Sequence, residues 1–552
     1  GTLALRGYTM RSDHAASAHT RDLPQESLIR SNELLVRLGL TEHQLYEHQR
    51  TCLLIVGSAV LIAPTGSGKT ESALLWACAQ PVGGQQTPRL FYTLPFQASM
   101  NAMHDRLCER AFPGQVGLEH SRAVLALYRR LLEANYGPKQ AARLARWSGN
   151  LARLNYYPVR VLSPYQLLKA PYRLRGYEIL LSDLFDAAII LDEVHAYESE
   201  RLALILATMK YLRTHFGARF FVMSATLPKL LQERLIDTLG QYTSVRATAE
   251  LFTSFRRHFL RLLDGELLDS RWLTHIAKVA KTGASVLVCC NTVKRAQQAY
   301  EELTKRLQCT VETILLHGRF NGRDRLHREI QVQQATGSQS KERRPIVLVA
   351  TQVVEVSLDI DLDVIYTDPA PIEALIQRFG RVNRRRLHQS APVYVFSQPT
   401  DGQGVYDAEL VRRAVAVLSK YADAMIDEES ISDWLDEVYE GDVAARWNER
   451  YERAYHEFEA GCLATLRAFN SDDHLETAFY QAFDSVEVLP RNLETEYFRL
   501  VEDEPLEASQ LLVPIRWTQL ASLQSTGRVR QDPRWRVKIV DVPYTEQGLQ
   551  LG

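Results

Sequence analysis

Cysteine is sparse in this sequence, and its spacing fits neither a metal site nor a disulfide framework. The 552 residues include seven cysteines, at positions 52, 78, 108, 289, 290, 309 and 462. No Cys-x-x-Cys pair occurs, so we expect no zinc knuckle, and the scattered positions form no disulfide pattern. We therefore expect reduced, mostly buried cysteines in a reducing, cytoplasmic compartment.

Long apolar runs are also missing. No stretch of 18 apolar residues occurs, and the first 30 residues lack the apolar core of a secretion signal, so we expect no membrane partner. With 46% hydrophobic and 24% charged residues, the composition is that of a soluble globular protein. The length favours about three to four domains.

Charge is distributed unevenly, although the net charge is only −1. Residues 421–510 carry 24 Asp and Glu but only six basic residues, a net charge of −18, whereas the remainder carries +17. Two interpretations stay open: an acidic helical surface beside a basic body, or a basic body that binds phosphate while the acidic part does not. Because an acidic wall repels DNA, we favour docking or packing against the basic body as the role of this region.

Apolar strands alternate with helical patterns twice along the chain. This alternation predicts two consecutive α/β blocks with parallel sheets, joined near residues 245–265. The expected strands are 59–63, 89–93, 186–191 and 219–223 in the first block, and 284–289, 311–316, 345–350 and 363–367 in the second.

Other segments depart from this alternation. An Arg- and Ala-rich helical stretch is inserted at 120–155, and the apolar-poor segment 330–345 is expected to be a flexible loop. Beyond residue 405 the pattern turns helical and acidic, and it ends in strand-like pieces at 510–516 and 534–544.

A phosphate-binding loop runs from Ala63 to Thr70, with the sequence Ala-Pro-Thr-Gly-Ser-Gly-Lys-Thr. It follows an expected strand and opens an expected helix, as a P-loop requires. Glycines let backbone N–H groups converge on phosphate, the lysine reaches the β and γ phosphates, and the last hydroxyl is offered to Mg²⁺. The candidate ATP-binding residues are Thr65, Gly66, Ser67, Gly68, Lys69 and Thr70, and Lys69 is also a candidate catalytic residue.

An acidic motif follows the apolar segment Ala187 to Leu191. Asp192, at the strand end, is a candidate Mg²⁺ ligand together with Thr70, and Glu193 is the candidate base that polarises the attacking water. Ser224-Ala225-Thr226 follows another expected strand. Small hydroxyl residues there can sense the acidic pair, although a simple turn has the same pattern.

Three arginines recur at three-residue spacing between Gln377 and Arg384 (QRFGRVNR). A helix would present Arg378, Arg381 and Arg384 on one face. That face is either a solvated basic surface or a set of arginine fingers that complete the ATPase site from the second block. Gln377, Arg381 and Arg384 are candidate catalytic residues, and Arg378 is a candidate nucleotide contact.

These motifs resemble superfamily 2 helicases, and closely the CRISPR-associated type I helicase family, over about residues 40–400. The resemblance implies two tandem RecA-like parallel-sheet domains with a C-terminal, mostly helical accessory domain. Besides the motifs above, it rests on Tyr92 to Asn101 (YTLPFQASMN), Val161 to Gln166 (VLSPYQ), Asp192 to Tyr197 (DEVHAY), Ser224 to Pro228 (SATLP), Asn291-Thr292, Leu316 to Phe320 (LHGRF), Thr351 to Asp361 (TQVVEVSLDID) and Pro543 to Leu549 (PYTEQGL).

The resemblance also implies roles for single residues. Gln49 would contact the adenine side of ATP, and Asp359 would lie near the nucleotide. Contacts to phosphate position a DNA strand without reading its sequence. The residues implied to contact single-stranded DNA in this way are Thr93, Gln97, Ser163, Thr292 and Thr351. The family further implies ATP and Mg²⁺ as cofactors, 3′-to-5′ translocation and recruitment by a Cascade-like RNA-guided effector complex.

Many members of the family carry an HD nuclease domain ahead of the helicase. Here 62 residues precede Ala63, and the sole His-Asp dipeptide, His104-Asp105, lies in an expected helix without companion metal-binding histidines. We interpret it as an ordinary helical pair. We therefore expect a stand-alone helicase subunit whose nuclease is supplied by a partner.

The expected domains are an N-terminal lead segment at 1–40, a first RecA-like domain at 41–248, a second at 249–405 and the accessory domain at 406–552. The predicted function is ATP-dependent unwinding of target DNA in type I CRISPR interference. Two alternatives stay open: a DExH-type RNA helicase in RNA processing, and an ATP-gated binding subunit that clamps partners without turnover.

Overall fold

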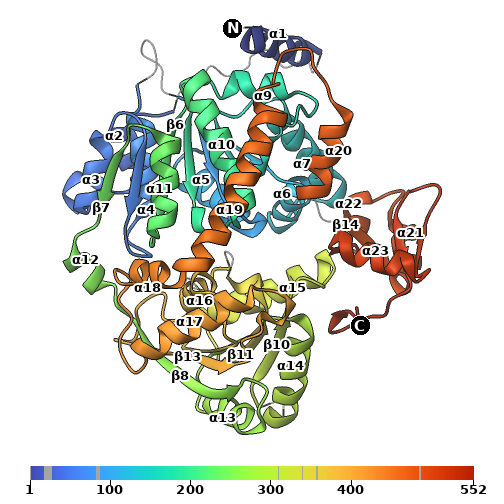
Figure 1. The fold of residues 1–552 in the computed structure, drawn as a ribbon. Coiled ribbons are helices and arrows are strands. Elements are labelled where there is room, and N and C mark those ends of the chain that lie inside the picture. Colours follow the sequence, from blue (N-terminus) through green and yellow to red (C-terminus); the bar gives the residue numbers. More distant parts are fainter. Residues whose placement is uncertain are drawn as a thin grey trace. The chain divides into compact units, whose positions relative to one another are not determined.

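The chain folds into two compact units, each built from two separate stretches of sequence (Figure 1). The computed structural model describes residues 2–17, 28–81, 88–308, 310–337, 340–355, 358–483 and 486–551. Unit 1 consists of Gly1–Phe255 together with Asp427–Phe483. Unit 2 consists of Arg256–Ile426 together with Asp484–Gly552.

Unit 1 contains a seven-stranded sheet in the order β3-β4-β2-β5-β6-β1-β7, and all of its strand pairs are parallel. Its strands are β1 (Ala59–Ile62), β2 (Leu90–Thr93), β3 (Val116–Glu119), β4 (Val159–Leu162), β5 (Ala188–Asp192), β6 (Arg219–Ser224) and β7 (Thr243–Arg246). β1 and β2 are buried along their whole length, which explains their continuous apolar runs. Because the strands are parallel, the loops after β1, β6, β5 and β2 lie along one edge of the sheet.

Helices separate these strands along the chain, as a parallel sheet requires. They are α1 (Thr2–Ser17), α2 (Ser31–Leu38), α3 (Glu47–Leu54), α4 (Lys69–Ala79), α5 (Gln97–Arg110), α6 (Ala123–Glu133), α7 (Pro138–Arg153), α8 (Pro164–Leu168), α9 (Tyr177–Asp183), α10 (Ser199–Phe216), α11 (Lys229–Leu239) and α12 (Ala249–Ser254). The helical stretch expected at 120–155 is confirmed as α6 and α7.

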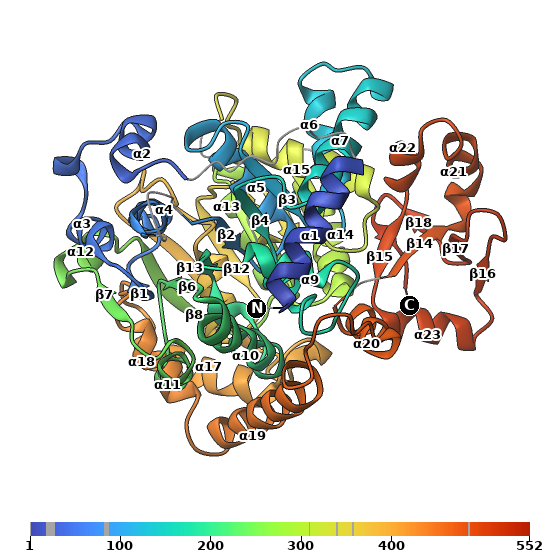
Figure 2. The same ribbon diagram turned by 90° about the horizontal axis from the view of Figure 1, so that it is seen from above.

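The first helix, α1, packs along α9 (Figure 2). A Cβ atom at Gly7 would come within 2.1 Å of the carbonyl oxygen of Glu178, so only glycine allows this approach. Arg11 donates a hydrogen bond to Asp183 at 2.8 Å, and both side chains are almost completely buried. The described beginning of the chain is thus part of unit 1.

Unit 2 contains a six-stranded parallel sheet in the order β10-β11-β9-β12-β13-β8. Its strands are β8 (His258–Glu266), β9 (Val286–Cys289), β10 (Glu312–Leu316), β11 (Ile346–Ala350), β12 (Val364–Thr367) and β13 (Ala391–Gln398). The helices between them are α13 (Ser270–Lys281), α14 (Val293–Leu307), α15 (Gly322–Thr336), α16 (Ile372–Phe379) and α17 (Ala408–Tyr421).

The expected flexible loop at 330–345 is partly wrong, because α15 continues to Thr336. The segment is polar on average, but Val332 and Ala335 are three residues apart and both are completely or almost completely buried. Two buried side chains on one helical face are enough to fix this turn in the core of unit 2. The helix ends at Gly337.

The C-terminal region contributes to both units. Residues 427–483 belong to unit 1 and form α18 (Ile431–Val438), α19 (Gly441–Phe458) and α20 (Asp473–Phe483). Residues 486–551 belong to unit 2 and include a four-stranded sheet in the order β15-β14-β17-β16. Its strands are β14 (Val486–Pro490), β15 (Val513–Ile515), β16 (Val529–Gln531) and β17 (Lys538–Val540), and the helices beside them are α21 (Glu494–Leu500), α22 (Pro505–Ser509) and α23 (Trp517–Ser525). A short hairpin of β18 (Tyr544–Thr545) and β19 (Gly548–Leu549) follows.

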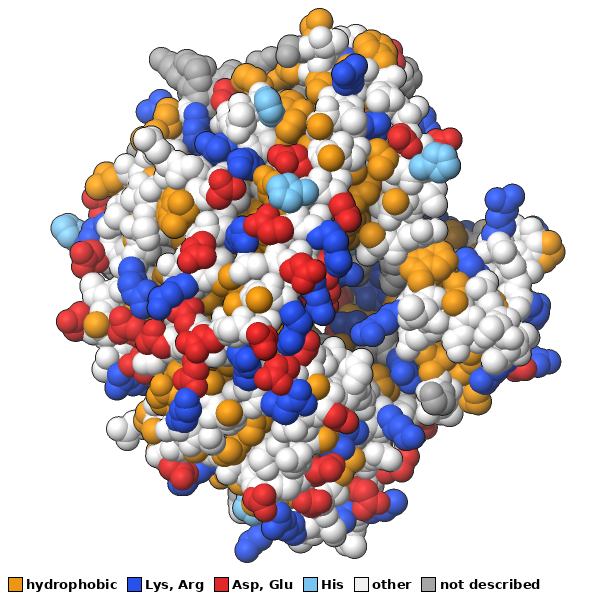
Figure 3. All heavy atoms as spheres, viewed as in Figure 1, with side chains coloured by type: hydrophobic (Ala, Val, Ile, Leu, Met, Phe, Trp, Pro, Cys, Tyr) orange, Lys and Arg blue, Asp and Glu red, His pale blue; other side chains and the backbone are white. Residues whose placement is uncertain are grey.

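Acidic side chains gather over α18 and α19 on the face shown in Figure 3. Several of them form ion pairs with basic residues of the same unit: Glu452 with Arg234, Asp436 with Lys229 at 3.5 Å, and Glu429 with Arg246 at 3.5 Å. Part of the negative charge of this region is thus balanced by the basic body on which it packs.

The fold class predicted from the sequence is confirmed: two parallel-sheet α/β domains and a helical C-terminal region. Among the described residues, no helix combines the length and apolar character needed to cross a membrane. The six cysteines in this part of the chain are free thiols, and five of them are buried. Cys309 lies outside the described residues.

Candidate nucleotide and nucleic-acid site

The P-loop connects the end of β1 to the start of α4 at Lys69. Gly66 and Gly68 have φ angles of 92° and 83°, the left-handed region that glycine adopts without strain. A Cβ atom at Gly68 would also lie 2.3 Å from Nε2 of Gln49. The loop therefore needs glycine here both for its backbone conformation and for the close approach of α3.

Lys69 and Gln49 are held by the loop itself. Nζ of Lys69 donates to the carbonyl oxygen of Ala63 at 3.0 Å. Gln49 is 5% exposed, donates from Nε2 to the Gly68 carbonyl at 3.2 Å and accepts from the Tyr46 amide at 2.9 Å. The structure thus brings the expected adenine-side glutamine into contact with the phosphate-binding loop.

The second half of the candidate site lies at the end of β5. The hydroxyl of Tyr92, on the neighbouring strand β2, donates to Oδ2 of Asp192 at 2.9 Å. Burial and the adjacent Glu193 raise the pKa of Asp192 to about 7, whereas Lys69 and the Tyr92 hydrogen bond favour its charged form. A further positive charge beside Asp192 would stabilise its carboxylate form.

His195 connects the acidic motif to the next strand. Its Nε2 lies 3.1 Å from Oε2 of Glu193, and its Nδ1 lies 3.0 Å from the Ser224 hydroxyl at the end of β6. The expected link between the Ser224-Ala225-Thr226 turn and the acidic pair therefore exists, and it runs through His195.

The residues at this edge fit a magnesium–nucleotide complex. Thr70 and Asp192 offer a hydroxyl and a carboxylate, and hard oxygen donors are what Mg²⁺ prefers. Within the described part of the chain, no three His, Cys, Asp or Glu side chains form a metal-binding group. One or two protein oxygens suit Mg²⁺, because this ion keeps several waters and binds substrate phosphates for the rest of its coordination.

One contact to the P-loop comes from far along the chain. The Thr65 amide donates to Oε2 of Glu428 at 2.8 Å, and Glu428 is only 8% exposed. Glu428 lies at the start of the second stretch of unit 1, between α17 and α18. No motif marks this residue, and only its placement in the fold reveals it.

Arg378 has a structural role in unit 2, and its expected contact with the nucleotide stays a prediction. The side chain is completely buried inside unit 2. Its guanidinium donates to Glu355 at 2.8 Å, to the Thr367 hydroxyl at 2.7 Å and to the Asn291 amide oxygen at 3.0 Å. Because these bonds engage each of its nitrogens, Arg378 joins the ends of β9 and β12 to the loop after β11.

The expectation that Arg378, Arg381 and Arg384 share one helical face is wrong. Helix α16 ends at Phe379, and Asn383 has a φ angle of 48°, which a helix does not allow. Arg381 donates to the carbonyl oxygens of Glu355 at 2.8 Å and Leu358 at 3.1 Å.

Arg384 and Asp359 lie together on the surface of unit 2. Nη1 of Arg384 is 3.5 Å from Oδ1 of Asp359, and both side chains are close to half exposed. Both are therefore accessible to a ligand. Gln377 lies in the last turn of α16 and is partly buried.

The residues expected to contact DNA differ in accessibility. Thr93 is 1% exposed and its hydroxyl donates to the Ile190 carbonyl at 2.8 Å within the sheet, and its contact with DNA stays a prediction. Gln97 is exposed at the start of α5 and donates to Ser121 at 2.9 Å. Thr292 caps α14, and Ser163 and Thr351 follow β4 and β11 but are 7% and 3% exposed. A strand contact by these last two hydroxyls would require local opening.

The His104-Asp105 pair is part of a structural network in unit 1. Arg130 of α6 forms an ion pair with Asp105 at 2.6 Å and a 3.1 Å contact with Nδ1 of His104. The pair thus fastens α6 to α5, in agreement with its interpretation as an ordinary helical pair.

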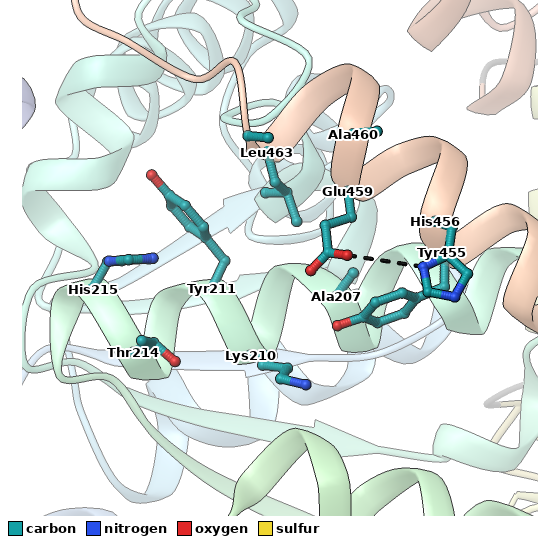
Figure 4. A pocket seen from close by; sticks show the side chains of 11 residues that line it. Ala207, Lys210, Tyr211, Thr214, His215, Tyr455, His456, Glu459, Ala460 and Leu463 are labelled. Carbon is teal, nitrogen blue, oxygen red and sulfur yellow. Dashed lines mark ion pairs between the residues drawn. The ribbon is translucent and has the colours of Figure 1, made fainter.

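A separate groove with a volume of about 630 Å³ lies between α10 and the end of α19 (Figure 4). Lys210, Tyr211 and His215 line it from α10, and Tyr455 and His456 line it from α19. None of its lining residues belongs to the candidate nucleotide site, so the groove marks only where the returning C-terminal stretch packs on unit 1.

Two family models each match part of one of the two large sheets. Residues 46–233 match the family described as DEAD/DEAH box helicase. Residues 282–387 match the family described as CRISPR-associated nuclease/helicase Cas3, C-terminal. The P-loop and the acidic motif lie in the first of these segments, as expected for an ATP-dependent helicase domain.

More particularly, the chain is similar to Cas3 proteins. A putative CRISPR-associated nuclease/helicase Cas3 of Methanocaldococcus jannaschii is 28% identical over 393 residues, which cover 69% of this chain and 52% of that protein. The chain spans about half the length of the curated relatives it matches.

Solved structures show the same fold. T. fusca Cas3 with AMPPNP has a TM-score of 0.68 at 20% identity, over 96% of this chain and 70% of that chain. A chain of a CRISPR RNA-guided surveillance complex before nicking has a TM-score of 0.58 at 20% identity, over 93% of this chain and 68% of that chain. At this level of identity the likeness is one of fold.

Proposed function

We propose that this chain is an ATP-driven translocase on single-stranded DNA that unwinds target DNA in type I CRISPR interference. The proposal rests above all on one observation: the P-loop residues Lys69 and Thr70 and the strand-end pair Asp192 and Glu193 lie at the same edge of the unit 1 sheet. That arrangement is suited to hydrolysis of a nucleoside triphosphate.

In the proposed reaction, Lys69 exchanges its carbonyl partners for phosphate oxygens, and Glu193 orients and polarises the attacking water. Thr70 and Asp192 would hold Mg²⁺, which neutralises charge on the phosphates when bound. We propose that Arg381 and Arg384 of the second domain act as arginine fingers, with Gln377 beside them. Such fingers contribute about 10³ to 10⁵ in rate, so Arg384→Ala should strongly reduce turnover.

The proposed DNA contacts are made by accessible groups at strand ends, above all Gln97 and Thr292, with Ser163 and Thr351 after local opening. Alternating closure on ATP and opening after hydrolysis would move the strand past these contacts. By resemblance to the family we propose 3′-to-5′ movement, recruitment by a Cascade-like effector complex and cutting by a partner nuclease.

ATPase stimulation tests the proposal directly. Phosphate release by the purified chain should rise strongly with single-stranded DNA and far less with RNA of the same length. A partial duplex with a 3′ tail should be unwound, and one with a 5′ tail should not. Glu193→Gln is the matched control, because it keeps the size of the side chain and removes the base.

The other outcomes identify the alternatives. Stronger stimulation by RNA would favour an RNA helicase, and nucleotide binding without any stimulated release would favour an ATP-gated clamp. Degradation of single-stranded DNA by the chain with manganese, nickel or cobalt, if it survives Lys69→Ala, would contradict the proposal that a partner does the cutting.

A further inference from the structure

Tyr92, the first residue of the motif YTLPFQASMN, lies in the candidate ATPase site although the sequence assigns it no role there. It is the third residue of β2, and its ring is completely buried. Its hydroxyl donates to Oδ2 of Asp192 at 2.9 Å and also interacts with the side chain of Thr70. One phenol therefore contacts both residues that fit the magnesium ion.

The sheet register explains why a tyrosine can do this. β2 and β5 are parallel neighbours, and Tyr92 is paired with Ile190, two residues before Asp192. Side chains two residues apart in a strand point to the same face, so Tyr92 and Asp192 share one face of the sheet. Tyr92 and Asp192 are diagonal neighbours on adjacent strands. A long aromatic side chain spans the distance between them, and a short side chain would not.

The hydrogen bond also has a defined direction. A phenol that is completely buried needs a partner for its O–H group, and a carboxylate oxygen is an acceptor. With Oδ2 occupied by this bond, the orientation of the Asp192 carboxylate is fixed and Oδ1 is left for other ligands. Arg106 lies 3.4 Å from the Thr70 hydroxyl and pairs with Glu71, so it does not replace the phenol at Asp192.

We propose that Tyr92 is a positioning residue of the metal–phosphate site. Its hydroxyl orients Asp192, at the end of β5, and Thr70, in the first turn of α4, relative to each other. The proposal rests on the assignment of Thr70 and Asp192 in the proposed function, but not on DNA translocation. Removing a hydrogen-bond partner of a metal ligand typically weakens metal affinity by roughly ten- to a hundredfold.

Tyr92→Phe separates positioning from packing, because it keeps the buried ring and removes only the hydroxyl. The measurement is the binding of a fluorescent ATP analogue to the full chain, first in EDTA and then over a Mg²⁺ titration. In EDTA the variant should bind the analogue as the parent chain does. The Mg²⁺ concentration that gives half of the metal-dependent tightening should rise by about tenfold or more.

Two further variants complete the test. Tyr177→Phe removes the hydroxyl of another buried tyrosine in unit 1, which donates to the Arg467 carbonyl, and should leave the Mg²⁺ titration unchanged. Tyr92→Leu also lacks the hydroxyl and gives a second measurement if the phenylalanine variant does not fold. A further readout is the steady-state ATPase, in which kcat should fall more than KM changes.

The outcomes are distinguishable. An unchanged Mg²⁺ titration in folded Tyr92→Phe overturns the positioning role, and so does an equal loss of affinity with and without Mg²⁺, since that would indicate a packing defect. Absence of DNA-stimulated ATPase activity in the parent chain would instead contradict the proposed function. The Mg²⁺ titration would still test the positioning role of Tyr92.

Discussion

The backbone amide of Thr65 donates its hydrogen bond to the carboxylate of Glu428, 363 residues further along the chain. A P-loop amide is suited to an anion, and here the anion is a side chain of the same unit. The nearly buried Glu428 carboxylate places negative charge beside the loop that is proposed to bind a triphosphate. Glu428 and the nucleotide therefore repel each other in the same small region.

Glu428→Gln should tighten nucleotide binding. The amide keeps the shape and an acceptor oxygen for Thr65 but removes the charge that opposes the phosphates. At about 8–10 Å and an effective dielectric constant near 20, relief of the repulsion between two unit charges corresponds to about 2 kcal/mol, a gain of roughly fifteen- to thirtyfold in affinity. Equilibrium binding of a fluorescent ADP analogue measures it. Glu429→Gln is the control, because Glu429 pairs with Arg246 instead, and equal effects of both variants would contradict the prediction.

Asp192→Ala should abolish hydrolysis while leaving the fold intact. The substitution removes the carboxylate proposed to hold Mg²⁺, so kcat for phosphate release should fall by roughly a hundredfold or more. The control is Asp237→Ala, in which an exposed carboxylate of α11, paired with Lys210, is removed. Turnover near the parent value in Asp192→Ala would mean that the metal and phosphates lie elsewhere.

Arg378→Ala should destabilise unit 2, because it leaves the Glu355 carboxylate unpaired and nearly buried. Breaking a buried ion pair by removing one partner costs about 3–5 kcal/mol. Urea unfolding, with a probe for unit 2, measures this loss. Arg384→Ala provides the contrast, since its side chain is 44% exposed and should change the free energy of unfolding by less than about 1 kcal/mol. An Arg378→Ala variant with unaltered stability would contradict this structural role.

Stability of unit 2 should decrease below neutral pH through His258. This side chain is buried, its Nε2 lies 2.8 Å from the Val382 carbonyl, and burial lowers its pKa to about 3. Burial thus favours the neutral imidazole in the folded chain. The contribution of His258 to the stability of unit 2 is complete above pH 6.5 and is lost as the pH falls toward 3. Between pH 7 and pH 5 the loss amounts to about 2 kcal/mol.

His258→Gln provides the test, because glutamine can donate to Val382 but does not titrate. Urea unfolding at pH 7 and pH 5 should show a smaller pH-dependent loss in the variant, by about 2 kcal/mol. An equal pH dependence of the free energy of unfolding in the two proteins would contradict the prediction. It would mean that protonation of His258 does not differ between the folded and the unfolded chain.

Sequence patterns predicted what is decided locally. The strands at 59–63 and 345–350 could be predicted because a strand covered on both faces is apolar throughout, as β1 and β11 are. The P-loop could be predicted because its glycines satisfy a local backbone requirement. Edge strands such as β8 were missed, since its residues alternate irregularly between buried and partly exposed positions.

Contacts across the sheet could not be read from the sequence. Thr93 matches a motif, but the strand direction turns its hydroxyl to the Ile190 carbonyl, whereas the adjacent Tyr92 reaches Asp192. The spacing of Arg378, Arg381 and Arg384 suits a helix, but Asn383 takes a left-handed conformation and breaks it. In each case a neighbour distant in sequence decides where the side chain goes.

The interleaved composition of the two units has a consequence for synthesis of the chain. Since unit 1 includes Asp427–Phe483, its core cannot be completed when the ribosome has produced only the first 255 residues. Arg256–Ile426 is translated before the second stretch of unit 1. During that time, the surface of the first sheet's unit that later packs against Tyr451 and Phe458 stays exposed. Expression of residues 1–255 alone should therefore yield an aggregation-prone product, and a plasmid that also supplies 427–483 as a separate peptide offers a way to rescue it.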